Sequence, residues 1–264
     1  MKNIAALVMA AGFLASPALA ADLPVKAPAF APPAVYNWSG FYLGASAGAV
    51  WNRSEISYAA NPLFFTAATP QLNADGSPTL TEAGFTGGLL AGYNLQSGHF
   101  VYGLETDFQY TGGSPSQSIT RAAAPGLTLG YTVSESVKSD WLWTLRPRLG
   151  VTLGASMPSL LYVTGGLAVA DVKFTQASIF PNCPCGISNT ESKVKTGWTV
   201  GAGWELALSG AWTARAEYLY VDLGKLSFDD NLAAFGFPGA TFTHEAKVTE
   251  HIARVAVSYR FGAR

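Results

Sequence analysis

The segment SDWLWTLRPRLGV, residues 139–151, has one aromatic and one basic face if its backbone is extended. Alternate side chains of a β-strand point to opposite faces of the sheet, so Trp141 and Trp143 share one face while Arg146 and Arg148 share the other. Two environments accept such a strand. In a soluble sandwich the arginines face water, whereas in an outer-membrane barrel the aromatic face meets lipid and the arginines face the lumen.

The chain is poor in charge. Charged residues make up only 12% of its 264 residues, and the formal net charge is −1. Soluble globular domains carry about 25% charged residues, so a large uncharged surface is expected here. After the N-terminal segment the sequence has no apolar run of about 18 residues, which a transmembrane helix requires. Low charge without such a run indicates strands with alternating apolar side chains, and the balanced charge gives no reason to expect a nucleic acid partner.

The N-terminal segment has the features of an export signal. Residues 1–20, MKNIAALVMAAGFLASPALA, contain Lys2, a short apolar stretch and a small-residue cleavage pattern, so they are predicted to be a secretory signal peptide. Residues 21–37 are rich in alanine and proline and are predicted to be an extended periplasmic tether. The remaining residues, 38–264, are predicted to form one barrel domain.

Period-two patterns recur along this domain and predict eight strands. In the last of them, Ala253, Val255 and Val257 alternate with the polar face that carries Arg254. Several of these strands run for about ten residues, which is the length that crosses a bilayer when a strand is tilted. The predicted strands are approximately 38–51, 82–94, 100–110, 139–151, 160–171, 196–207, 212–223 and 249–261.

The connections between these strands alternate in length. Outer-membrane barrels have short periplasmic turns, long external loops and an even number of strands. The sequence therefore predicts an all-β fold, an eight-stranded antiparallel up-and-down transmembrane β-barrel with four long external loops. The predicted loops are 52–81, 111–138, 172–195 and 224–248, and the predicted short turns are 95–99, 152–159 and 208–211.

The face opposite the aromatic side chains carries acids and bases in nearly equal number. Side chains fill the interior of an eight-stranded barrel, and removing one partner of a buried ion pair costs about 3 to 5 kcal/mol, so these charges are expected to pair. We interpret them as a structural plug, and a charge-lined channel remains the alternative. The predicted lumen charges are Glu82, Glu105, Asp107, Arg146, Arg148, Glu205, Arg215, Glu217 and Arg254.

Aromatic side chains gather near the ends of the predicted strands. Amphipathic rings are stable at headgroup depth, so this pattern predicts two aromatic girdles. The alternative that they are ordinary core aromatics stays open, because Trp143, Trp198 and Trp204 lie nearer to the middles of strands. The predicted girdle residues are Trp38, Phe41, Trp51, Tyr110, Trp141, Trp212, Tyr259 and Phe261.

Few residues point to chemistry. Cys183 and Cys185 lie in one loop without a second pair of metal ligands, so a loop disulfide or a free surface pair is expected. His244 and His251 lie beside glutamates but have no adjacent serine, which leaves a lipid hydrolase as a weaker alternative. The segment GFTGGLLAG lies inside a predicted strand, which argues against a dinucleotide-binding loop. We therefore predict no enzyme activity, no catalytic residues, no cofactor and no metal site.

Several segments together resemble one family of barrels. ALAADLP, YNWSGFYLGASAG, WLWTLRPRLG, LLYVTGGLA, TGWTVGAGWE, RAEYLYVDLG and HIARVAVSYRF resemble the alphaproteobacterial outer-membrane immunogenic proteins, small porin-family barrels related to the OmpA membrane domain and the Opa adhesins. The resemblance implies a cell outer membrane location with surface-exposed loops. Chains of that family usually end on the aromatic of YRF, whereas Gly262, Ala263 and Arg264 follow Phe261 here, so the terminal assembly signal is expected to be displaced.

The resemblance also implies roles in envelope integrity and in surface or host contact. These contacts are expected at the four long external loops, because binding residues commonly lie on loops held by a rigid scaffold. The expected partners are outer-membrane lipid and lipopolysaccharide, the barrel-assembly machinery through the C-terminal strand, and surface ligands at the loops. A small-solute porin is the main alternative. A soluble lipocalin-like binder is the last one, and it requires the opposite orientation of the two strand faces.

Overall fold

A computed structural model describes residues 36–126, 130–154, 157–181 and 185–262. The expected signal peptide and nearly all of the expected tether lie outside the described residues. The described part is almost entirely antiparallel sheet. Its strands are β1 (Gly40–Ala60), β2 (Thr79–Ser97), β3 (Phe100–Thr111), β4 (Ser116–Arg121), β5 (Tyr131–Leu153), β6 (Ser159–Phe180), β7 (Cys185–Ala207), β8 (Trp212–Leu232) and β9 (Phe237–Arg260).

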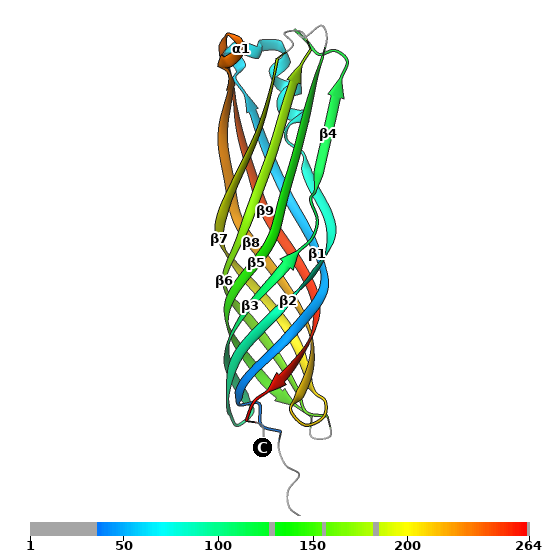
Figure 1. Ribbon diagram of the computed structural model, residues 1–264, viewed down its shortest axis with the longest axis vertical. Helices are drawn as coiled ribbons and strands as arrows, with labels where there is room; N and C mark the ends of the chain where they lie inside the picture. Colours follow the sequence, from blue (N-terminus) through cyan, green and yellow to red (C-terminus); the bar gives the residue numbers. More distant parts are fainter. Residues whose placement is uncertain (1–35, 127–129, 155–156, 182–184, 263–264) are drawn as a thin grey trace, which may run out of the picture. The chain divides into compact units, whose positions relative to one another are not determined.

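Eight of these strands close into a ring. The order of hydrogen-bonded neighbours is β3-β2-β1-β9-β8-β7-β6-β5, and β5 pairs in turn with β3 (Figure 1). The short strand β4 pairs only with β5, beyond the end of β3. The predicted eight-stranded up-and-down barrel is therefore confirmed.

Side chains alternate between lumen and exterior along each ring strand. On β5, Arg146 and Arg148 are buried, whereas Leu145 before them and Leu149 after them are exposed. The arginine face of residues 139–151 therefore points into the lumen. The outer face of every ring strand carries exposed apolar side chains, including Leu43, Leu89, Leu104, Leu149, Val163, Val200, Tyr218 and Val255.

Seven of the eight ring strands extend beyond the residues that the sequence pattern predicted, and this corrects the expected loops. The segments 172–195 and 224–248 are mostly strand, with 181–184 and 233–236 connecting β6 to β7 and β8 to β9. In 52–81 strand continues over 52–60 and resumes at 79 after the short helices, and 111–138 contains β4 and the first residues of β5. Outward-facing apolar side chains mark only the part of a strand that faces lipid. Beyond that part, the outward side chains are mostly serine, threonine and charged residues and the apolar side chains face inward, so the alternation changes face while the hydrogen-bonded ladder continues.

Above the lipid-facing band, the ring opens into two facing sheets. β7 and β8 pair only from Trp198 and Asp222 downward, and β2 pairs with β3 only from Thr86 to Ser97. No ladder joins β2 to β4 or the outer half of β7 to β8 among the described residues. The outer halves therefore form one sheet of β2, β1, β9 and β8 and another of β4, β5, β6 and β7. We call this part the outer extension.

Short helices lie at the outer end of the extension. They are α1 (Pro62–Phe65), η1 (Thr66–Ala68), α2 (Thr69–Asp75) and η2 (Ala233–Phe235). α1 begins because the Asn61 side chain accepts a hydrogen bond from the Leu63 amide and Pro62 occupies the first position. None of the helices in the described residues is long and apolar enough to span a membrane.

The predicted girdle aromatics occupy two levels of the barrel exterior, with one exception. Phe41, Trp212, Tyr259 and Phe261 cluster near the short turns, where Phe41 and Phe261 have ring centroids 5.6 Å apart. At the other level, Trp51, Tyr110 and Trp141 face outward, and Tyr110 lies directly opposite Trp141. Charged side chains on the barrel exterior begin just beyond this second aromatic level. All six lysines of the described part lie there, at 138, 173, 193, 195, 225 and 247.

The glycines that face the lumen allow close approach of neighbouring strands, and this gives a first prediction. A Cβ at Gly48 would overlap the Ala253 carbonyl oxygen and would lie 2.6 Å from the Cα of Arg254. We expect Gly48→Val to destabilise the barrel by at least about 1 to 3 kcal/mol, the usual cost of overpacking. The measurement is urea unfolding of the refolded protein in detergent, followed by tryptophan fluorescence.

The matched control is Ala49→Val, on the neighbouring outward-facing position of β1, where an added apolar group meets lipid or detergent. We expect Ala49→Val to unfold at nearly the same urea concentration as the wild type. Equal stability of the two variants would show that the backbone spacing around Gly48 adjusts freely.

Candidate functional site

A buried ionic network centred on Arg146 of β5 crosses the lumen. The guanidinium of Arg146 is fully buried and lies 2.8 Å from Glu105, 2.6 Å from Asp107 and 3.3 Å from Glu217. Glu105 lies directly opposite Arg146 on the neighbouring strand β3. Glu217 comes from β8, three strands away around the ring. One side chain therefore links opposite walls of the barrel.

Three further arginines complete the network. All of them are buried, and each lies within ion-pair distance of one or two lumen carboxylates. Both terminal nitrogens of Arg215 donate hydrogen bonds to the Glu105 carboxylate oxygens, with N–O distances of 2.5 and 3.0 Å. This is the bidentate geometry of strong arginine–carboxylate pairs. The other pairs are Arg148–Glu205 at 2.8 Å, Arg254–Asp107 at 2.9 Å and Arg254–Glu217 at 2.6 Å.

Two tyrosines that the sequence analysis did not single out belong to the same network. The Tyr42 hydroxyl donates to Glu105 at 2.7 Å, and the Tyr162 hydroxyl donates to Glu217 at 3.0 Å. The guanidinium of Arg148 also stacks over the Tyr162 ring, 3.9 Å from its centroid. Both tyrosines occupy inward positions of the period-two pattern, and their parity alone marks them as lumen residues.

Charge in this network is balanced. It contains four carboxylates, Glu105, Asp107, Glu205 and Glu217, and four guanidinium groups, so its net charge is zero when all are ionised. Moving a single charge out of water costs several kcal/mol, and only close opposite charges and hydrogen bonds offset that cost. The arrangement can hold the strands together, and each charge inside this network has an opposite charge beside it.

Glu82 is the one predicted lumen charge outside this network, and that prediction is wrong. The residue is exposed, and its carboxylate accepts a hydrogen bond from the Ser114 amide at 3.0 Å. β2 stops pairing with β3 at Thr86, so Glu82 lies at the opening between β2 and β4. Its parity is that of a lumen residue, but the ring is no longer closed at its height.

Trp38 is the one predicted girdle residue that does not face outward, and that prediction is also wrong. The ring is only 1% exposed and packs with Val101, Leu160 and Tyr162 at the end of the lumen near the short turns. Its amide donates to the Gln96 side chain at 2.7 Å. Trp38 precedes the first residue of β1, so strand alternation does not govern its direction.

The same end of the lumen holds a further cation. The Arg260 guanidinium lies 4.2 Å from the centroid of the Tyr36 ring, and Tyr36 packs edge-on against Trp38. Tyr36 belongs to the segment predicted to be an extended tether, but its ring packs against side chains of the barrel. These rings cover the ionic network from the periplasmic side.

Apolar side chains fill the lumen on the other side of the network. One buried cluster spans both sheets of the outer extension, and Phe174 of β6 and Ile252 of β9 are among its fully buried members. A second cluster lies beneath the short helices and contains Phe65 and Leu72 of α1 and α2. Its other members include Tyr58, Tyr131, Phe180, Leu232 and Phe242.

One ion pair holds α2 over the end of the extension. The Asp75 carboxylate is buried and accepts two hydrogen bonds from Arg121 of β4, each 2.7 Å, and one from the Tyr131 hydroxyl, also 2.7 Å. The Arg121 guanidinium lowers the pKa of Asp75 to about 2. The outer mouth is therefore closed by packed helices that a strong ion pair fixes in place.

Two ionisable side chains are buried in the outer extension without a close partner. Both carboxylate oxygens of Glu135 on β5 lack a hydrogen-bond partner, and burial raises its pKa to about 8. Burial also lowers the pKa of His244 to about 4, and its nearest carboxylate, that of Asp230, is 3.7 Å away. Both groups are therefore uncharged at neutral pH, like the apolar side chains around them.

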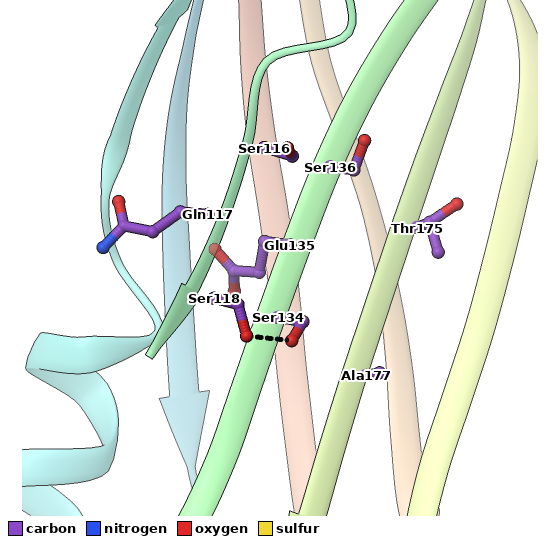
Figure 2. A pocket seen from close by; sticks show the side chains of 8 residues that line it. All are labelled: Ser116, Gln117, Ser118, Ser134, Glu135, Ser136, Thr175 and Ala177. Carbon is purple, nitrogen blue, oxygen red and sulfur yellow. Dashed lines mark hydrogen bonds between the residues drawn. The ribbon is translucent and has the colours of Figure 1, made fainter. Parts of the chain in front are cut away.

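A groove on the outside of the extension is lined by hydroxyl groups. It has a volume of about 330 Å³ and lies over β4, β5 and β6 (Figure 2). Figure 2 shows that Ser118 and Ser134 hydrogen-bond to each other, with 2.7 Å between their oxygens. Glu135 contributes to this wall, but its carboxylate oxygens are buried. The groove thus offers hydroxyls that already pair with one another and no accessible charge.

The residues considered for chemistry do not come together. The His251 ring faces outward at the second aromatic level and hydrogen-bonds the Tyr218 hydroxyl at 2.6 Å, whereas His244 is buried in the lumen among aromatic rings. Cys185 at the start of β7 is buried and disulfide-bonded, and Cys183 lies outside the described residues. Among the described residues, no group of three or more His, Cys, Asp or Glu side chains is placed to hold a metal ion.

The central position of Arg146 gives a second prediction. Replacing it by methionine leaves Glu105, Asp107 and Glu217 with one buried cation fewer, so Arg146→Met should lower the free energy of unfolding by about 3 to 5 kcal/mol. Urea unfolding in detergent measures this loss. The control Glu82→Gln removes an exposed carboxylate and should change stability by less than about 0.5 kcal/mol, and similar effects of the two variants would contradict the assignment of the network.

The buried carboxyl of Glu135 gives a third prediction. The folded protein keeps this proton up to about pH 8, while the unfolded chain releases it near the ordinary glutamate value of 4.5. In that window the unfolded state binds fewer protons, so Glu135 makes the free energy of unfolding fall as pH rises. We expect Glu135→Gln to gain stability over the wild type as pH increases, by up to about 1.4 kcal/mol per pH unit.

Urea unfolding of both proteins at about pH 5 and about pH 8 measures this difference. His244 titrates in both proteins, so its opposite contribution cancels in the comparison. A difference between Glu135→Gln and the wild type that stays constant with pH would mean that Glu135 is hydrated or paired in the folded protein.

Comparison with known proteins agrees with this architecture. The family model described as "Outer membrane protein beta-barrel domain" matches residues 6–261. The 31 kDa outer-membrane immunogenic protein of Brucella melitensis is 36% identical over 265 residues, which cover 99% of this chain and 100% of the relative. The 22 kDa outer membrane protein of Rhizobium leguminosarum is 31% identical over 199 residues, covering 75% of this chain and 71% of the relative.

A solved structure, the outer membrane protein OprG from Pseudomonas aeruginosa, aligns with a TM-score of 0.43 at 12% identity, covering 86% of this chain and 98% of OprG. The family assignment itself rests on the sequence matches, which extend over nearly the whole chain. They confirm the resemblance noted from the sequence and the location in the outer membrane. The chain belongs to the outer membrane protein beta-barrel domain family.

Proposed function

We propose that this outer-membrane protein is a non-conducting, non-enzymatic barrel that contributes to envelope integrity and makes surface or host contacts through its outer extension. The observation that carries the first part is the filled lumen. Trp38 and Tyr162, the ionic network, and two apolar clusters follow one another along the barrel. A small-solute porin needs a continuous aqueous path, and these layers leave little room for one.

The ionic network supports this function energetically. A hydrated ion that enters the lumen must displace a carboxylate–guanidinium contact such as Arg146–Asp107 at 2.6 Å, and breaking a buried pair costs about 3 to 5 kcal/mol. Further out, the ion meets apolar side chains such as Phe174 and Ile252, which provide no ligands. These contacts therefore favour a rigid barrel wall and oppose the passage of ions through the lumen.

The absence of enzyme activity is likewise part of the proposal. His244 and His251, the histidines considered for a lipid hydrolase, lie on the inner and outer faces of the same strand and therefore point away from each other. Hydrolysis by a serine enzyme requires a histidine within hydrogen-bond reach of the nucleophile. In the described residues, the hydroxyl hydrogen-bonded to His251 is that of Tyr218.

The outer extension supports the role in contact. Its two sheets carry the strands well beyond the outward-facing aromatic residues Trp51 and Trp141. Binding residues often lie on loops that a rigid scaffold holds in position, and the short loops here are held by long ladders. The C-terminal strand β9 pairs with β1 on one side and with β8 on the other. This pairing is what we expect of a strand that contacts the barrel-assembly machinery.

Single-channel recording gives the fourth prediction and tests the proposed closed lumen. The purified protein, refolded in detergent and inserted into planar bilayers, should give no steady conductance steps, only silence or rare brief openings. Insertion is checked independently by the altered migration of the folded barrel in unheated denaturing gels. Stable conductance of the folded protein would contradict the proposal and favour the small-solute porin.

A further inference from the structure

The outer tip of the protein is free of charge. At this end, the sequence has no Asp, Glu, Lys, Arg or His in four stretches that cover most of the connections and the adjoining strand ends, 61–74, 122–130, 177–190 and 231–243. The nearest ion pair, Arg121–Asp75, is neutral as a unit. Tips of exposed loops are usually polar, so this composition requires an explanation.

Two of these stretches expose apolar side chains at the same end of the barrel, and we call these side chains together the apolar tip. It consists of Leu63 and Phe64 of α1, Phe235 of η2, and Phe237 at the start of β9, with α1 and η2 at the same end of the barrel (Figure 1). Leu63 is 90% exposed, and the three phenylalanines are between 38% and 44% exposed. Phe64 and Phe237 touch, with ring centroids 6.0 Å apart.

The apolar tip is held rigidly. The Asn61 amide donates to the Thr241 carbonyl at 2.9 Å, and its side chain donates to the Gly239 carbonyl at 3.0 Å. These bonds join the residue before α1 to the first residues of β9. Phe65 next to the apolar tip is buried against Phe180 and Phe242, so α1 is anchored from below while Leu63 projects outward.

Backbone groups within the tip are largely satisfied by the tip itself. The amides of Leu63, Phe64 and Phe65 all donate to Asn61, to its side chain or its carbonyl, at 3.0 to 3.2 Å. In the other loop, the Gly236 amide donates to the Ala233 carbonyl at 3.0 Å. An unpaired backbone group costs several kcal/mol in hydrocarbon, so internal pairing lowers the cost of moving these turns out of water.

The composition of the tip distinguishes between a protein and a lipid partner. Protein interfaces concentrate Tyr, Trp and Arg at their centres and carry about ten hydrogen bonds. The apolar tip consists instead of one Leu and three Phe, and the stretches around it carry no charged side chain to steer or orient a protein partner. Exposed Phe and Leu side chains are the ones that enter the boundary between headgroups and acyl chains, and the missing cations favour a zwitterionic over an anionic surface.

We propose that the apolar tip docks onto a second, zwitterionic lipid bilayer that faces the cell surface. Leu63, Phe64, Phe235 and Phe237 enter the bilayer interface, while the outer extension keeps the barrel at a distance. This inference rests on the surface-contact part of the proposed function and names the class of partner.

A flotation assay tests this fifth prediction with the full-length protein. The protein is reconstituted in phosphatidylcholine nanodiscs, which shield its own lipid-facing band, and is mixed with phosphatidylcholine liposomes. We expect it to float with the liposomes, with little change when salt is raised or anionic lipid is added. The double variant Leu63→Ser with Phe235→Ser should lose at least about ten-fold in binding, because each exposed side chain contributes free energy on leaving water.

Leu208→Ser is the matched control, because Leu208 is also exposed but lies in a short turn at the opposite end of the barrel. It should float like the wild type. Folding of every variant is checked by gel migration, so a loss of binding cannot result from misfolding. The proposal is overturned if the double variant floats as well as the wild type, if binding requires anionic lipid and disappears in high salt, or if nanodiscs pair with one another instead of binding liposomes.

Failure of this assay is separate from failure of the closed-lumen proposal. Channel recordings depend on the ionic network and its apolar covers, which the tip variants do not touch. A silent protein that does not float would retain the closed barrel and remove only the lipid surface as its partner.

Discussion

The structure depends on the pairing of four arginines with four carboxylates inside the barrel. Each of these charges is buried, so each must point inward and find its partner, and this requirement fixes the face of the strand that carries it. A shift of one residue would turn Arg146 and Arg254 toward lipid and Glu217 with them. The network therefore determines register as well as stability, and the lipid-facing apolar band follows from it.

Much of the fold and of the site was predictable from the period-two pattern. The pattern placed Arg146, Arg148 and Arg215 in the lumen, because within a closed ring every second side chain must face inward. The structure locates them there, together with all the predicted acids except Glu82. The number of strands and the short turns also followed from the sequence, since both depend on local signals.

Other features depend on pairing between distant strands, which a single sequence does not reveal. Glu82 has inward parity, but β2 leaves its neighbour at that height, so its side chain meets solvent. Trp38 precedes β1 and folds back over the lumen. The outer halves of the strands alternate in the opposite sense, because water surrounds them: apolar side chains such as Ile56 and Phe174 face inward and polar ones face outward. The cross-strand ladders, such as β8 with β9, identify these segments as a continuation of the same strands.

The length of the outer extension has a consequence for what can reach this protein. From Trp51 to Ala60, β1 adds roughly 30 Å of strand beyond the outer aromatic level. Even with the usual tilt, this holds the helices and connecting turns well away from the lipid-facing band. A large molecule that approaches this end of the barrel therefore meets the helices and turns before it reaches the level of the lipid headgroups.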